Sequence, residues 1–225
     1  MTEDKVIEHF EKNRADRNDR YQVFPANQSG SNPSFMQFAN ELSNSIMHRD
    51  LDYILQHVDK DFTVKPLEGR GLEPFKKYFF LETNPEQSIL WRVLSDALEL
   101  GGVFVDPGLS IYEAPYTKSR FPEELESDSC MVALFPDVEV HQYPDDSSSV
   151  VDVLRFDVVK VLQPLPLSEL PNDIEIEDVF KWERIGTFND KTGYVPVEQI
   201  RRPYSNIVTF KRKNNRWVIS EVSNR

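Results

Sequence analysis

The sequence predicts a mixed α+β protein in which a mostly helical part precedes a small, strand-rich part and a closing β-hairpin. Two patterns predict this order. Apolar residues recur at helical spacing between residues 33 and 100, whereas short runs after Cys130 alternate apolar and polar residues as strands do. With 225 residues, of which 39% are apolar and 12% aromatic, the chain is long enough for one large or two small cores.

We expect four consecutive segments. Residues 1–32 form an amino-terminal helix and a flexible linker, and 33–127 form a mostly helical unit with extended chain wrapped on its surface. Residues 128–203 form a small β-barrel that carries an acidic insertion at 163–181. Because an isolated hairpin is marginally stable, we expect the last segment, 204–225, to dock back on the helical unit.

The amino-terminal segments differ in composition. Residues 3–19 place a few apolar side chains at helical spacing, and 25–32, PANQSGSN, has the composition of a flexible linker. The amino terminus is charged throughout, and the sequence has no apolar run of about 18 residues. We therefore expect neither a signal peptide nor a membrane span in the sequence as given, and a trimmed leader if the protein is exported.

Capping residues mark the expected helices. Asn32 before Pro33 combines a capping side chain with a first-turn proline, and Asp50 is placed to cap a second short helix. Asn84 and Pro85 predict a further helix start. An apolar stripe follows the first cap and consists of Phe35, Phe38, Ala39, Leu42 and Ile46.

The strand-rich part has a hairpin pattern at residues 182–196. Trp182 begins a short strand, and a polar turn of Asn, Asp, Lys and Thr follows. Gly193 has no Cβ and therefore suits a close backbone approach. Pro196 lacks an N–H and is expected to leave the sheet. A second hairpin turn, with residues that tolerate positive φ, is expected at Asn214.

These residues resemble a known family. The stretch WERIGTFNDKTGYVP resembles the distal hairpin and closing turn of an SH3-like barrel, and VEVHQYP at 138–144 resembles the start of a bacterial SH3 (SH3b) domain. Over about residues 35–222 the order of elements resembles bacterial SH3 domain-containing proteins of unassigned function. The resemblance implies a non-catalytic binding or scaffold protein that recognises peptidoglycan or a cell-envelope peptide, located in the cell envelope or periplasm.

The same resemblance assigns a candidate binding surface to Trp182, Tyr194 and Pro196. The alternative is that Trp182 and Tyr194 mainly fill the core of the barrel. A further resemblance, to NTF2-like domains, rests on the helices at 33–58 and the carboxy-terminal strands. It implies an inserted barrel and a small-ligand pocket lined by Phe35, Phe38, Phe79 and Trp217.

Charge is distributed unevenly over a chain whose net charge is −12. Residues 121–180 contain 15 acidic and 2 basic residues, whereas 201–225 contain 1 acidic and 7 basic residues. Overall acidity argues against nucleic acid as the main partner, because phosphate binding requires a basic footprint. An acidic, toxin-neutralising interaction protein that binds a basic partner through 121–180 is therefore the alternative function.

The sequence does not predict an enzyme. Cys130 and His141 are the two residues to weigh for cysteine-peptidase chemistry, but Cys130 runs into an apolar strand, where a buried thiol behaves as a small hydrophobe. A single cysteine excludes an internal disulfide and any site with several cysteine ligands. No phosphate loop, nucleophile elbow or zinc-protease motif is present, so we expect neither a cofactor nor a metal.

Overall fold

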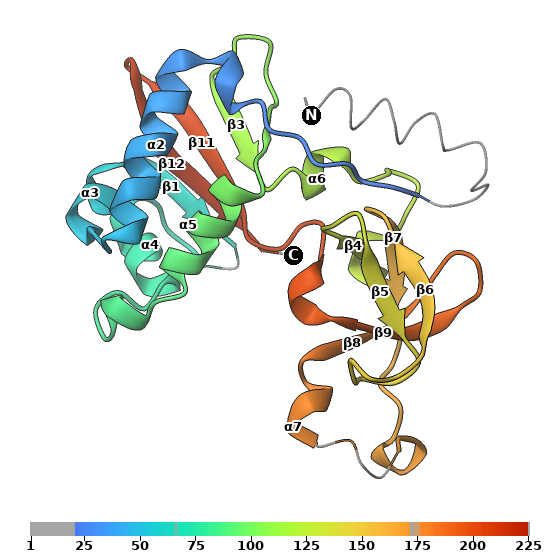
Figure 1. Cartoon of the computed structure of the whole chain (residues 1–225). Coiled ribbons are helices and arrows are strands. Elements are labelled where there is room, and N and C mark those ends of the chain that lie inside the picture. The colour runs from blue at the N-terminus through green and yellow to red at the C-terminus, as the bar shows by residue number, and fades with distance from the viewer. Residues whose placement is uncertain (1–20, 66, 172–173, 175, 225) are drawn as a thin grey trace. The chain divides into compact units, whose positions relative to one another are not determined.

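The structure, a computed structural model, contains helices and two β-sheets and is therefore of the predicted mixed α+β class (Figure 1). It describes residues 21–65, 67–171, 174 and 176–224. The helix predicted at 3–19 lies outside these residues.

The chain forms two compact units. The first, here called the α+β unit, joins residues 25–120 to 204–225, and the second, the β unit, joins 121–203 to the stretch that ends at Phe24. The β unit is thus inserted in the sequence of the α+β unit. The final hairpin and the helical segment were predicted as separate segments. They belong to one unit, because the hairpin strands share a sheet with strands from residues 58–114.

The α+β unit contains the first helices and five strands. Its helices and 3-10 turns are η2 Ser29–Ser31, α2 Pro33–Met47, α3 Leu51–Gln56, α4 Leu72–Tyr78, η3 Pro85–Gln87, α5 Leu90–Glu99 and α6 Thr117–Arg120. Its strands are β1 Val58–Val64, β2 Val103–Phe104, β3 Ile111–Ala114, β11 Ile207–Lys213 and β12 Arg216–Ser223.

These strands form one sheet in the order β1-β12-β11-β3-β2. The pairing of β1 with β12 is parallel and the others are antiparallel. The closing hairpin therefore lies inside the sheet, which confirms that it docks on the helical part. Its turn residues Asn214 and Asn215 have φ of 50° and 62°, the left-handed conformation that asparagine tolerates. Figure 1 shows α2 and α5 on one face of this sheet.

The predicted helix caps are present. Asn32 Oδ1 accepts hydrogen bonds from the N–H groups of Ser34 (3.0 Å) and Phe35 (3.2 Å). Asp50 Oδ1 accepts one from the N–H of Tyr53 at 3.0 Å. Each cap satisfies backbone donors that the first helical turn leaves without partners, so both starts could be predicted from local sequence.

Aromatic side chains dominate the core of this unit. The ring centroid of Phe35 lies 4.1 Å from that of Tyr112 and 4.9 Å from that of Trp217. Trp217 Nε1 donates to Ser34 Oγ at 3.0 Å, so its polar atom is satisfied inside the core. Burying a side chain of this size contributes about 1.5–3 kcal/mol.

The predictions for two regions outside the expected helices, residues 25–32 and 103–127, are wrong. Residues 25–32 are not a flexible linker, because Gln28 is bonded to the sheet edge: its N–H donates to Gly102 O and its Oε1 accepts from Phe104 N–H, both at 2.9 Å. Residues 103–127 are not simply extended chain on the surface, since they contain β2, β3 and α6. The segment predicted as mostly helical, residues 33–127, thus contributes three strands to a five-stranded sheet.

The helix predicted to start at Asn84 starts later. Residues Pro85–Gln87 form a single 3-10 turn, and Ser88 is extended. Ser88 Oγ accepts from the N–H of Leu90 at 3.1 Å, so α5 begins there. Trp91 Nε1 donates to the carbonyl of Pro85 at 2.7 Å and holds the turn against the helix, a contact that the sequence pattern did not indicate.

The β unit contains seven strands. Its helices and 3-10 turns are η4 Ser127–Ser129, η5 Leu167–Glu169, α7 Ile176–Val179 and η6 Val197–Gln199. Its strands are β4 Cys130–Ala133, β5 Val138–His141, β6 Val150–Leu154, β7 Val158–Val161, β8 Trp182–Gly186, β9 Thr192–Pro196 and β10 Ile200–Arg201.

The strands pair in the order β10-β4-β7-β8-β9-β5-β6, so β10 and β6 are the two edges and strand pairing does not close the sheet into a barrel. The run of residues 150–162 is divided into β6 and β7 near Phe156, whose φ is 58°. The insertion at 163–181 forms η5 and the short helix α7 in its described parts.

Gly193 is required by a close backbone approach, as predicted. A Cβ at this position would lie 2.5 Å from the carbonyl oxygen of His141 and 2.7 Å from Val140 Cγ1. Neighbouring strands can therefore pack closely only because residue 193 has no side chain. The apolar face beneath the hairpin consists of buried residues such as Ile185 and Val195.

Candidate functional site

The three residues predicted to line a binding surface lie on one face of the β8–β9 hairpin. Trp182 is paired with Pro196, and Arg184 is paired with Tyr194. Because side chains alternate along a strand and paired residues share a face, these four side chains project to the side opposite the buried Ile185. The structure thus brings the predicted residues together on the outer face of the hairpin.

Tyr194 is covered on that face and is only 4% exposed. The chain that follows β7 crosses here: the N–H of Leu162 donates to Arg184 O at 2.9 Å, and Arg184 Nη1 donates to Gln163 O at 2.8 Å. Burial raises the pKa of the Tyr194 phenol above its ordinary value. Tyr194 is therefore a packing residue of the hairpin, and the structure leaves it little surface for a ligand.

Trp182 and Pro196 are half-buried. The ring of His141 meets that of Trp182 edge-on, with centroids 5.3 Å apart and an angle of 70° between the rings. His141 Nδ1 lies 3.1 Å from the carbonyl oxygen of Ser148, which can only accept, so Nδ1 carries a proton. His141 is buried and supports the indole of Trp182 from within the fold.

Two exposed apolar side chains extend this face and were not predicted. Phe180 is 79% exposed and Val197 is 43% exposed. The N–H of Val197 donates to the carbonyl of Lys181 at 2.9 Å, which continues the pairing of Trp182 with Pro196 by one residue on each side, and Phe180 directly precedes Lys181. We call Phe180, Trp182, Pro196 and Val197 the Trp182 patch. The sequence signal for Phe180 was a phenylalanine two residues before Trp182, with which β8 begins.

Acidic residues surround the Trp182 patch in the sequence. Glu177 and Glu198 are exposed, and Glu183 is half-buried. Residues 121–203 contain 18 acidic and 7 basic residues, which gives a net charge of −11, whereas the whole chain has a net charge of −12. An apolar patch within such a field is suited to a ligand that combines apolar and cationic groups.

Cys130 and His141, the two residues weighed for cysteine-peptidase chemistry, are not arranged as a nucleophile and its base. Cys130 is buried, and burial raises the pKa of its thiol. A thiol with a raised pKa forms little nucleophilic thiolate at neutral pH. Cys130 lies on β4 and His141 on β5, with three strands between them in the sheet.

Acid and base side chains cluster on the surface of the α+β unit around His57. Its Nδ1 lies 2.8 Å from the carbonyl oxygen of Tyr53, and its Nε2 lies 3.3 Å from Arg216 Nη2. The carbonyl accepts and the guanidinium donates, so the imidazole is neutral with its proton on Nδ1. Burial lowers the pKa of His57, and Arg216 adds to this effect. With both nitrogens engaged, His57 joins α3 to β12.

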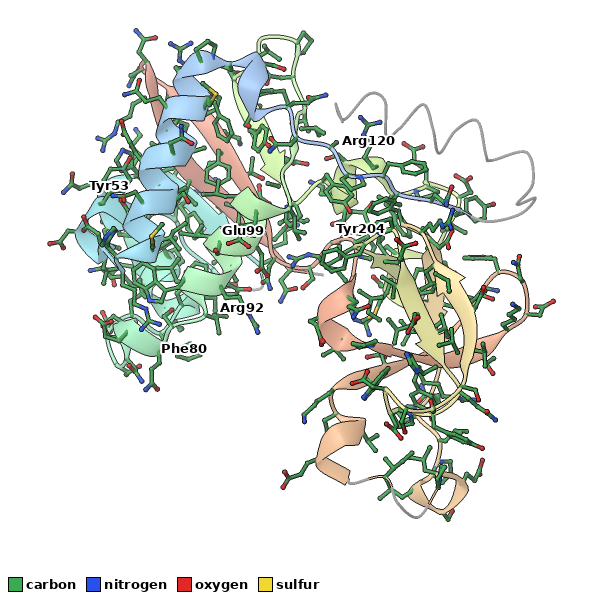
Figure 2. All side chains as sticks on the ribbon, in the orientation of Figure 1. Tyr53, Phe80, Arg92, Glu99, Arg120 and Tyr204 are labelled. Carbon is green, nitrogen blue, oxygen red and sulfur yellow. The ribbon has the colours of Figure 1, made fainter. Side chains whose placement is uncertain are left out.

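Tyr53 and Glu41 complete this cluster. Tyr53, which is labelled in Figure 2, stacks on His57 with centroids 4.2 Å apart, and its hydroxyl donates to Glu41 Oε2 at 3.0 Å. Burial, with the hydrogen bond to Glu41, raises the pKa of Tyr53. The phenol thus stays protonated, and the cluster is a contact between α2, α3 and β12.

The four residues predicted to line a small-ligand pocket lie in the core. Phe35, Phe38, Phe79 and Trp217 are all buried within one apolar cluster, and Phe35 contacts both Phe38 and Trp217. Rings in mutual contact occupy the space that a ligand would need. This filled core argues against the small-ligand prediction.

Comparison with protein-family models gives no match, and comparison with curated proteins gives none either. Among the described residues, no group of three or more His, Cys, Asp or Glu is placed to hold a metal ion. In that same part of the chain no helix is both long and apolar enough to cross a membrane. The functional argument therefore rests on the residues and surfaces described above.

Proposed function

We propose that this protein is a non-catalytic binding or scaffold protein that presents the Trp182 patch to a partner. The observation that carries the proposal is the exposed Phe180 beside the half-buried Trp182 and Pro196 on a strongly acidic unit. Aromatic residues at the centre of an interface supply much of the binding energy, and acidic residues at its rim select cationic partners.

We also propose that the β unit is an SH3-like barrel of the bacterial SH3b kind. Its strand order supports this: β7, β8 and β9 pair in succession, β10 pairs with β4, and the β5–β6 hairpin adds beyond β9. The 3-10 turn η6 between β9 and β10 and the Trp182–Pro196 pairing also agree with such a barrel.

The resemblance to SH3b domains favours peptidoglycan or a cell-envelope peptide as the ligand, and the cell envelope as the location. Peptides of that kind offer amino groups to the acidic rim and methyl groups to Phe180 and Val197. In this proposal Trp182 and Pro196 form the half-buried floor of the contact, and Tyr194 supports them from within.

Co-sedimentation with isolated peptidoglycan sacculi tests this proposal. Wild-type protein should pellet with the sacculi, and Phe180→Ala and Trp182→Ala should each weaken binding by about tenfold or more. Phe135→Ala is the matched control, because Phe135 is a 49% exposed phenylalanine of the same unit outside the patch. Circular dichroism must show that each variant is folded. If wild-type protein stays in solution, the peptidoglycan assignment fails.

A basic protein partner is the second candidate, and the net charge of −11 over residues 121–203 favours it. Such binding should be strong at low salt and weak at high salt, because screening shortens the range of surface charges. Titration with a fluorescent Lys-rich peptide that contains one Trp checks this. Affinity that salt leaves unchanged would exclude an electrostatic partner of this kind.

A further inference from the structure

Phe80, in the α+β unit, adopts a backbone conformation that L-residues rarely adopt. Its φ is 54°, in the left-handed region, and it directly follows Phe79, the C-cap residue of α4. The N–H of Phe80 donates to Lys77 O (3.3 Å) and that of Leu81 to Lys76 O (3.0 Å). This is the bonding pattern of a helix end at which glycine is usual. A phenylalanine here is strained, and strain of this kind points to a function for the side chain.

The side chain of Phe80 does not contribute to the core of its unit. It is 68% exposed and lies at the periphery of the unit (Figure 2). Its carbonyl accepts hydrogen bonds from the N–H groups of Thr83 (3.3 Å) and Asn84 (3.2 Å), and from Thr83 Oγ1 (3.1 Å). The backbone is therefore held firmly while the ring projects outward. A rigid, exposed aromatic residue is the kind that anchors an interface.

A cavity of about 510 Å³ lies next to Phe80, between α4 and the chain on either side of it. Phe80 and Pro74 contribute apolar surface to it. Charged side chains also line it, and these are Glu68, Arg70, Glu73, Lys76, Lys77 and Glu82. Within the described part of the chain none of these six has an ion-pair partner.

The charges of this cavity are arranged with a polarity. Lys76 and Lys77 lie in the last turn of α4, beside Phe80, whereas Glu73 lies in its first turn. Glu82 follows Phe80 by two residues, whereas Glu68 and Arg70 precede α4. Along the chain, the lining residues around Phe80 therefore carry one excess positive charge, and those up to Glu73 carry one excess negative charge. A rim with no net charge gives no basic footprint for nucleic acid or an anionic membrane.

We infer that the Phe80 cavity binds a peptide segment of a protein partner, which places one large apolar side chain against Phe80. The segment carries an acidic residue beside that anchor, facing Lys76 and Lys77, and a basic residue farther along, facing Glu73. The apolar contact supplies most of the affinity, and the charges set the direction of the peptide. This inference is independent of the Trp182 patch, which lies in the other unit.

Selection from a random peptide library displayed on phage, with the full-length protein as bait, tests this inference. Peptides that bind wild-type protein but not Phe80→Gly should be enriched, and they should contain a large apolar residue with an acidic and a basic neighbour. Synthetic copies should lose about tenfold or more in affinity for Phe80→Gly, and less for Lys77→Glu. Phe135→Ala, at an exposed phenylalanine outside both proposed binding sites, is the matched control and should bind them normally.

Phe80→Gly also separates loss of binding from loss of folding. Because glycine adopts the left-handed conformation without strain, the variant should melt at a temperature about 2 °C higher than wild-type protein. If the selection yields no peptide that depends on Phe80, or if Phe80→Gly lowers the melting temperature, the inference is overturned. Binding of sacculi by the Trp182 patch can succeed or fail without affecting this result.

Discussion

The two units differ in how they use charge. The β unit, over residues 121–203, carries a net charge of −11, whereas residues 25–120 and 204–225 of the α+β unit contain 14 acidic and 14 basic residues. The α+β unit is organised instead around an aromatic core. We infer that binding by the β unit depends on salt, and that binding by the Phe80 cavity depends mainly on apolar contact.

The largest effect is expected from the aromatic core. Phe35→Ala should lower the free energy of unfolding by about 3–5 kcal/mol, because it removes a fully buried ring and leaves a cavity. Urea denaturation measures this. Met36→Ala, at the next position of the same helix, is the control and should cost about 0.5 kcal/mol or less, because Met36 is partly exposed. Equal costs would contradict a core centred on Phe35.

A backbone approach in the β unit should give the next largest effect. Gly193→Ala should destabilise the protein by about 1–3 kcal/mol, because the new Cβ would lie 2.5 Å from the His141 carbonyl oxygen. Thermal unfolding measures this. Gly30→Ala is the matched control, since a Cβ there meets nothing within 4 Å. If Gly193→Ala is as stable as wild-type protein, β5 and β9 can move apart freely.

An ion cluster in the α+β unit should give a smaller, pH-dependent effect. Lys213 Nζ lies 2.5 Å from Asp59 Oδ2 and 3.3 Å from Asp61 Oδ2. Burial alone would raise the pKa of Asp59, but Lys213 and the N–H of Asp61 lower it below its ordinary value. The stabilisation is therefore present above about pH 4 and is lost as pH falls through the lowered pKa.

Asp59→Asn tests this assignment. It should cost about 1–2 kcal/mol at pH 7, a value kept small because the Lys213 side chain is 41% exposed. The difference between the variant and wild-type protein should shrink as pH falls below about 4. Asp52→Asn, which changes an exposed carboxylate of the same unit, is the control. A difference that does not vary with pH would show that charge is not the cause.

The smallest effect concerns His57. Because burial lowers its pKa, the unfolded chain binds more protons than the folded one just below about pH 6.5. Stability should therefore fall slightly as pH decreases through that value. Arg216→Ala should raise the pKa of His57, since the cation 3.3 Å from Nε2 is removed. NMR titration of the imidazole measures this, and an unchanged pKa would mean that burial alone sets it.

Local chemistry explains what could be predicted. Asn32 and Asp50 satisfy backbone donors within the next few residues. Gly193 lies where a Cβ would clash with a neighbouring strand, and Asn214 adopts a positive φ, so few residue types fit either position. Such features depend on neighbouring residues and can be recognised in one sequence. The same holds for the position of Trp182 at the start of a strand.

Long-range contacts explain what could not be predicted. Residues 25–32 are polar and rich in small side chains, and only the hydrogen bonds of Gln28 to Gly102 and Phe104 show that they are anchored on a sheet edge. Tyr194 appeared suited to a surface, and the crossing of the chain near Gln163 covers it. The exposure of Phe180, and the hydrogen bond that joins the adjacent Lys181 to Val197, were visible only in the structure.

The sequence by itself determined the α+β class, the helix starts at Asn32 and Asp50, the hairpin turns and the acidity of the inserted unit, because each depends on composition or on residues close in the chain. Only the tertiary structure decided that β1 lies beside β12, that Tyr194 is buried, and that Phe80 projects from a strained helix end beside a cavity. These features depend on residues far apart in sequence, whose packing is settled by the whole fold.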